Sequence, residues 1–231
     1  MFRSAALGLA AGLALLVSGA SAATLTYNGP STGVTGNTVR VTQAPVTIAG
    51  GGATPRDLSA YGFRMTEASL GEFLAWCLDL TNYLQTPTGS YSQTNAPFSQ
   101  WTVAQDRIQR MFDANFAGLD ATNRVQAAAF QLALWEALYD SDFDLTTGVF
   151  RGQGLLGTQS SAVDAAAAGY LAAASGYAGS RQYNLTYWQG LENTQGRQTQ
   201  SLVSVVPVPL PAGALLLITA LGAVAAVRRR S

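Results

Sequence analysis

Residues Phe73–Leu80 read Phe-Leu-Ala-Trp-Cys-Leu-Asp-Leu, a compact apolar run that lies between polar segments. A run of this length predicts a buried strand, with a helix as the alternative. On a strand, successive side chains alternate between two faces. One face would carry Phe73, Ala75, Cys77 and Asp79, and the other Leu74, Trp76, Leu78 and Leu80. The only cysteine of the chain is therefore expected on a strand with buried neighbours.

Beyond this strand the sequence becomes helical. The strongest helix is predicted over Asn123–Tyr139, with Thr122 as its cap. Further helices are expected over Val103–Phe116 and Ser161–Ala174. The apolar stripe of the strongest helix consists of Val125, Ala128, Ala129, Leu132, Trp135 and Tyr139.

Short strands are expected on both sides of these helices, at Thr38–Thr42, Val46–Ile48, Gln182–Trp188 and Gln198–Val206. The polar segment Thr86–Gln100 predicts a loop. Together the elements indicate an α+β fold, in which a strand-rich domain over residues 23–206 carries a helical insertion.

The N-terminus has the pattern of a secretory signal peptide. Arg3 precedes the uncharged stretch Ala5–Val17, and Ala20-Ser21-Ala22 supplies the small residues that signal peptidase recognises. We expect residues 1–22 to be removed before Ala23, and a retained N-terminal anchor is the alternative. The protein is therefore expected to leave the cytoplasm.

A second processing signal is predicted at the C-terminus, over residues 207–231. The motif Val208-Pro209-Leu210-Pro211-Ala212 precedes an uncharged segment, 213–227, and Arg228-Arg229-Arg230 follows it. The segment predicts a short transmembrane helix, and the arginines are expected on the cytoplasmic side. An ordinary tail anchor has the same topology without cleavage at the motif.

This tail closely resembles the VPLPA-CTERM variant of the PEP-CTERM sorting signals, which exosortases process in Gram-negative bacteria that make exopolysaccharide. The resemblance implies an inner-membrane anchor before processing, then a place at the cell surface or in the extracellular matrix. It also implies contact with exopolysaccharide.

The composition excludes several classes of function. All 13 basic residues are arginine, and the chain has neither lysine nor histidine. Histidine-dependent catalysis, histidine metal ligands and lysine Schiff bases are therefore excluded. Without its predicted ends the chain has a net charge of about −4 and no basic cluster, which argues against a nucleic-acid partner. Glu136 and Asp79 are too isolated in the sequence to predict a glycosidase pair. We expect no enzyme and no cofactor.

The alternating acidic residues Asp140, Asp142 and Asp144 are similar to the first half of a calcium loop. Leu145 stands where such a loop needs glycine, and Arg151 stands where it needs a bidentate glutamate. A solvated acidic turn is therefore the prediction, with no metal site.

Two residues suggest a covalent site. Cys77 alone could be a small buried hydrophobe, or less readily the partner of an intermolecular disulfide. Gln131 lies mid-helix at the edge of the apolar stripe, where its amide needs hydrogen bonds, so on its own it is a buried and hydrogen-bonded side chain.

Together, however, the segments Trp76-Cys77-Leu78-Asp79 and Phe130-Gln131-Leu132-Ala133-Leu134-Trp135-Glu136 resemble the two signatures of bacterial surface thioester domains. The resemblance implies that the Cys77 thiol displaces ammonia from the Gln131 amide and leaves an internal thioester. It implies an adhesin that attaches to amine-bearing molecules, with a shielding pocket expected from Trp76, Phe130 and Trp135. A structural surface protein with an inert Cys77 is the alternative.

Overall fold

The computed structural model describes residues 22–94 and 104–207, and in this part of the chain six strands close an antiparallel barrel. Around the barrel the strand order is β1-β4-β5-β9-β8-β6. Closure leaves these strands without an open edge. The strands are β1 (Ala22–Pro30), β4 (Phe63–Glu67), β5 (Gly71–Cys77), β6 (Thr88–Thr94), β8 (Tyr183–Gly190) and β9 (Leu202–Pro207).

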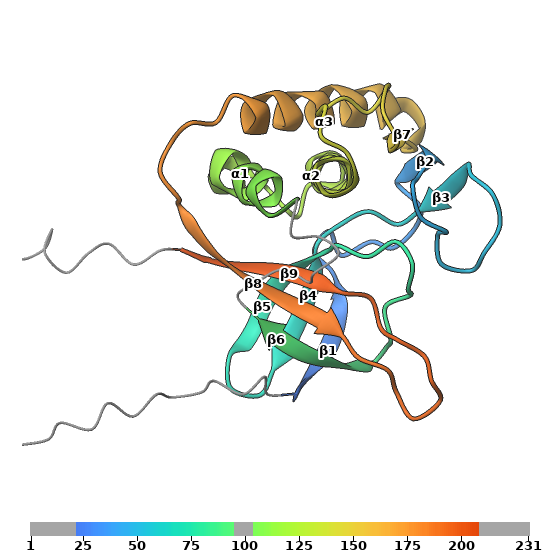
Figure 1. Cartoon of the computed structure of the whole chain (residues 1–231), viewed down its shortest axis with the longest axis vertical. Helices are drawn as coiled ribbons and strands as arrows, with labels where there is room; N and C mark the ends of the chain where they lie inside the picture. Colours follow the sequence, from blue (N-terminus) through green and yellow to red (C-terminus); the bar gives the residue numbers. More distant parts are fainter. Residues whose placement is uncertain (1–21, 95–103, 208–231) are drawn as a thin grey trace, which may run out of the picture.

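The helices are inserted in the sequence between β6 and β8. In Figure 1 helices α1 and α2 lie between the barrel and α3, which crosses over both. A small sheet with the order β3-β2-β7 lies beside them. These elements are α1 (Gln105–Asn115), α2 (Arg124–Tyr139), α3 (Ser160–Ser175), β2 (Val39–Gln43), β3 (Arg56–Leu58) and β7 (Arg151–Gly154), with short 3₁₀ turns at Phe116–Gly118 and Gly157–Gln159.

Helix α2 is the central element of this layer. It packs against α1, α3 and β7, and every residue from 127 to 138 is buried. The expected one-sided apolar stripe is therefore wrong, because neighbours cover the helix all round. Its cap is Asn123, whose Oδ1 accepts hydrogen bonds from the N–H groups of Val125 and Gln126. Thr122 is not the cap.

One continuous core joins the barrel to the helices. At the junction Trp76 of β5 meets Phe130 of α2 edge to face, with the ring centroids 4.7 Å apart. Tyr139, at the end of α2, adds a polar link, since its hydroxyl accepts from Leu80 N at 3.2 Å. These contacts fix α2 against the end of β5.

The structure confirms the predicted helices to within two residues at each end, and it confirms the strand in the apolar run, which ends at Cys77. The strands expected near the C-terminus are β8 and β9, and the first expected strand is β2. The strand expected at Val46–Ile48 is wrong, because that segment is irregular. The loop expected at Thr86–Gln100 is wrong for Thr88–Thr94, which is β6 and pairs with β1 and β8.

Within residues 22–94 and 104–207, no helix is both long and apolar enough to cross a membrane. The sorting motif and the transmembrane helix expected at 213–227 lie outside the described residues. So does the predicted signal peptide, except Ala22, which begins β1.

Candidate functional site

The structure brings Cys77 and Gln131 together across a sequence separation of 54 residues. The backbone N–H of Cys77 donates to Gln131 Oε1 at 2.9 Å, and Gln131 Nε2 donates to the Cys77 carbonyl at 2.8 Å. Both residues are buried. The side-chain amide of α2 is thus held against the last residue of β5 by two hydrogen bonds.

Strand register explains why these backbone groups are available to Gln131. The pairing of β5 with β4 ends at Ala75 and Phe63, whereas its pairing with β9 continues to Cys77 and Leu202. Hydrogen-bonding groups alternate between the two sides of a strand. The N–H of Leu78 donates to the Ser201 carbonyl, on the β9 side of the strand. The N–H and carbonyl of Cys77 therefore point to the opposite side, beyond the end of β4. The Gln131 amide occupies that place.

The Cys77 thiol donates a hydrogen bond to the carbonyl of Asp79, with Sγ 3.1 Å from the oxygen. Burial raises the pKa of the thiol well above its ordinary value, and the negative charge of Asp79 raises it further. The buried indole N–H of Trp135 lies near enough to lower that pKa slightly, although it meets no hydrogen-bond geometry in the described residues. The thiol is therefore neutral at physiological pH.

Asp79 is held by a tight turn after β5. Its Oδ1 accepts from the N–H and hydroxyl of Thr81, and its Oδ2 accepts from Asn82 Nδ2 at 2.7 Å. Its backbone carbonyl accepts from Gln200 Nε2 at 2.8 Å as well as from the thiol. These bonds fix the carbonyl that orients the Cys77 side chain.

A cavity of about 380 Å³ leads to Cys77. Its lining includes Cys77 and Trp135, which are buried, and Asp57 and Tyr83, which are exposed. The cavity therefore joins exposed side chains to the residue that carries the thiol. The aromatic lining residues are Tyr27, Tyr61, Phe63, Tyr83 and Trp135.

Only one of the three expected pocket residues, Trp135, lines this cavity. Trp76 and Phe130 do not line it, because they pack against each other at the junction of barrel and helices. Neighbouring strand residues point to opposite faces, so Trp76 and Cys77 cannot share one wall. The sequence did not predict the tyrosines that line the cavity, because the strands and loops that carry them have no clear hydrophobic pattern.

The geometry supplies one requirement of acyl chemistry at Gln131. The donor on Oε1, Cys77 N–H, stabilises negative charge that develops on this oxygen when a nucleophile attacks Cδ. The second hydrogen bond, from Nε2, fixes the plane of the amide. The amide oxygen and its donor thus belong to one buried contact, and the donor residue also carries the thiol.

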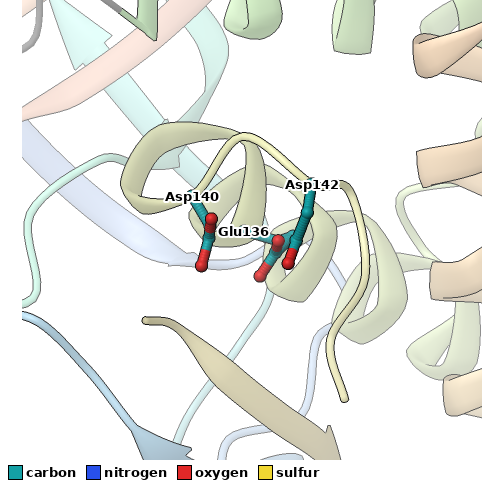
Figure 2. A group of neighbouring side chains, drawn as sticks. All are labelled: Glu136, Asp140 and Asp142. Atoms are coloured by element: carbon teal, nitrogen blue, oxygen red, sulfur yellow. The ribbon is translucent and has the colours of Figure 1, made fainter. Parts of the chain in front are cut away.

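A second group of polar side chains lies at the end of α2. One oxygen each from Glu136, Asp140 and Asp142 lies within 4.8 Å of the others, and Figure 2 shows the Glu136 carboxylate between the other two. The expectation that Glu136 is isolated is therefore wrong. The signal was present in the spacing, since residues four apart share one face of a helix.

Comparison with known proteins gives one structural neighbour. No family model matches the sequence, and no curated protein matches it. Among solved structures, the thioester domain of the Enterococcus faecium TIE86 protein is similar, with 13% sequence identity and a TM-score of 0.41. The match covers 84% of this chain and 80% of that chain. Likeness at this level assigns no role to any residue.

Proposed function

We propose that Cys77 and Gln131 form an internal thioester, and that the protein is a surface protein that attaches covalently to amines. The observation that carries the proposal is the paired hydrogen bonding of the Gln131 amide to Cys77, at 2.9 and 2.8 Å. These bonds hold the amide against the backbone of the residue that carries the only thiol of the chain, and that residue lines a cavity. The cavity lining includes the exposed residues Asp57 and Tyr83.

The proposed chemistry has two steps. Cys77 Sγ attacks Gln131 Cδ, the Sγ–Cδ bond forms, the Cδ–Nε2 bond breaks, and ammonia leaves with the thiol proton. An incoming primary amine then attacks Cδ, the Sγ–Cδ bond breaks, an amide forms and the sulfur regains a proton. Each molecule reacts once and is not regenerated, so the protein is not an enzyme. A chain without lysine has no side-chain amine to react with its own thioester.

A structural function is the second candidate, and one observation favours it. The thiol and both polar atoms of the Gln131 amide already have hydrogen-bond partners. In that account the Gln131 amide supplies the hydrogen bonds that a longer β4 would give to Cys77, and Cys77 is an inert core side chain. The protein is then a structural component of an exopolysaccharide matrix. Such a protein would not react with amines.

Amine coupling separates the two candidates. The purified protein is incubated with methylamine near neutral pH, digested with trypsin and mapped by mass spectrometry. We expect methylamine as an amide at position 131, in the peptide Val125–Arg151. Gln126, in the same peptide, serves as the internal control and should remain unmodified. If Gln131 stays unmodified and Cys77 is titratable from the start, the structural function is supported instead.

Export and sorting complete the proposed function. The predicted signal peptide directs the protein out of the cytoplasm, where signal peptidase removes residues 1–22. An exosortase then processes the tail at Val208–Ala212, and the protein passes from the inner membrane to the cell surface or the matrix.

Protein recovered from the native host should show this processing. No arginine lies between Arg197 and Arg228, so trypsin converts an intact tail into the peptide Gln198–Arg228. We expect a shorter peptide that begins at Gln198 and ends at or near the Val208–Ala212 motif. Detection of Leu215–Val227 in the mature protein would show that the tail is retained as a plain anchor.

A further inference from the structure

The carboxylates at the end of α2 have an unusual environment. Glu136 is fully buried, its Oε1 accepts from Asp144 N at 3.3 Å, and its Oε2 accepts no hydrogen bond in the described part of the chain. A buried carboxylate oxygen without a partner is costly. Figure 2 shows this carboxylate directed toward the same space as those of Asp140 and Asp142. A cation that binds oxygen ligands at that point would satisfy Glu136 Oε2.

The two aspartates are oriented by the loop that follows α2. Asp140 Oδ2 accepts from the N–H groups of Val149 and Phe150, the latter at 3.2 Å. Asp142 Oδ2 accepts from the Thr147 hydroxyl at 2.8 Å. Carboxylate oxygens have more than one acceptor site each, so these bonds leave room for a cation. The loop therefore fixes both carboxylates before any ion binds.

Charge and access also favour a cation. One oxygen from each of three acidic side chains lies within 4.8 Å of the others here. One positive charge lies nearby and partly offsets the acidic groups. It belongs to Arg107 of α1, whose guanidinium donates to the Ala137 carbonyl at 2.8 Å. Asp142 is exposed and lines a surface groove, so an ion can enter from solvent.

We propose that Glu136, Asp140 and Asp142 bind one calcium ion. All three ligands are carboxylate oxygens, the site is partly exposed, and calcium accepts six to eight oxygens in a flexible geometry that includes water. The ion would join the end of α2, the helix that carries Gln131, to the loop that leads into β7. This is not the loop considered from the sequence, because Asp144 instead binds Thr146 through its carboxylate.

Calcium titration of the chelator-treated, purified protein tests the site, with isothermal titration calorimetry and the melting temperature as readouts. We expect one site with a Kd of about 10⁻⁴ to 10⁻³ M and a rise in melting temperature. Glu136→Gln keeps the shape of the side chain and should weaken binding by at least about tenfold, as should Asp142→Asn at the exposed position. The site does not involve the thiol, so Cys77→Ser should bind calcium normally.

Asp144→Asn is the matched control, because it removes an acidic charge from the same loop, and the Asp144 side chain bonds to Thr146 while only its backbone N–H contacts the cluster. It should leave the affinity within about twofold. The proposal is overturned if calcium does not saturate a site below about 10 mM, or if Asp144→Asn weakens binding as much as Asp142→Asn. It is also overturned if choline chloride at equal ionic strength raises the melting temperature equally.

Discussion

Cys77→Ala is expected to abolish the coupling of methylamine to Gln131, from complete modification to none. The variant has no sulfur to displace ammonia, and an ordinary amide does not react with amines under these conditions. The fold should survive, because the side chain is small and alanine fits the same buried position, with a loss of about 1 kcal/mol in the free energy of unfolding. Mass spectrometry of the peptide Val125–Arg151 measures the coupling.

Cys77→Ser is the matched control for this loss. Serine keeps a donor for the Asp79 carbonyl, so the local hydrogen bonds persist while the thioester cannot form. Both variants should unfold cooperatively, with melting temperatures close to that of the wild-type protein. Coupling that persisted at Gln131 in either variant would show that sulfur takes no part in it.

Gln131→Ala should release a titratable thiol and should also destabilise the protein. The thiol appears because no acyl group is left for it to bind. The destabilisation follows because the variant leaves the Cys77 N–H buried without the Oε1 acceptor, which the thioester would retain. Such an unsatisfied group costs about 1–3 kcal/mol. Thiol titration of the unfolded protein, together with denaturant unfolding, measures both effects.

Gln126→Ala provides the control on the same helix. Gln126 lies near the start of α2, where its Oε1 accepts from Asp120 N in an exposed contact. Its removal should cost less than about 1 kcal/mol and should leave amine coupling intact. If the two variants were equally stable, the hydrogen bond from Cys77 N–H to Gln131 Oε1 would contribute nothing measurable. If the Gln131→Ala variant and the wild-type protein gave the same amount of titratable thiol, the wild-type sulfur would carry no acyl group.

Local patterns in the sequence predicted the helices but not the barrel. A helix is predicted over Asn123–Tyr139, and the structure confirms it within one residue, although the helix is buried all round. Strand β6, by contrast, consists of Thr, Gly, Ser, Tyr and Gln, which also form loops. It is a strand because β1 and β8 supply hydrogen-bond partners on both sides. Partners that are distant in the sequence leave no local signal.

The two central residues of the site could be named from the sequence, but their surroundings could not. Cys77 is the only thiol and Gln131 a polar residue in an apolar helix, but the two were paired only by the resemblance of their segments to thioester-domain signatures. That Gln131 bonds to the backbone of Cys77 depends on where β4 stops, which only the strand register shows. The cavity wall, with Tyr27 and Tyr61, likewise depends on the closure of the barrel.

The intact mass of the freshly purified protein tests the central claim most directly. The termini are first identified by peptide mapping, so that the expected mass follows from the sequence. We predict a mass lower than this value by one ammonia, with no titratable thiol and with the peptides Met65–Arg107 and Val125–Arg151 joined. The full sequence mass, with Gln131 unchanged and Cys77 titratable, would contradict the thioester.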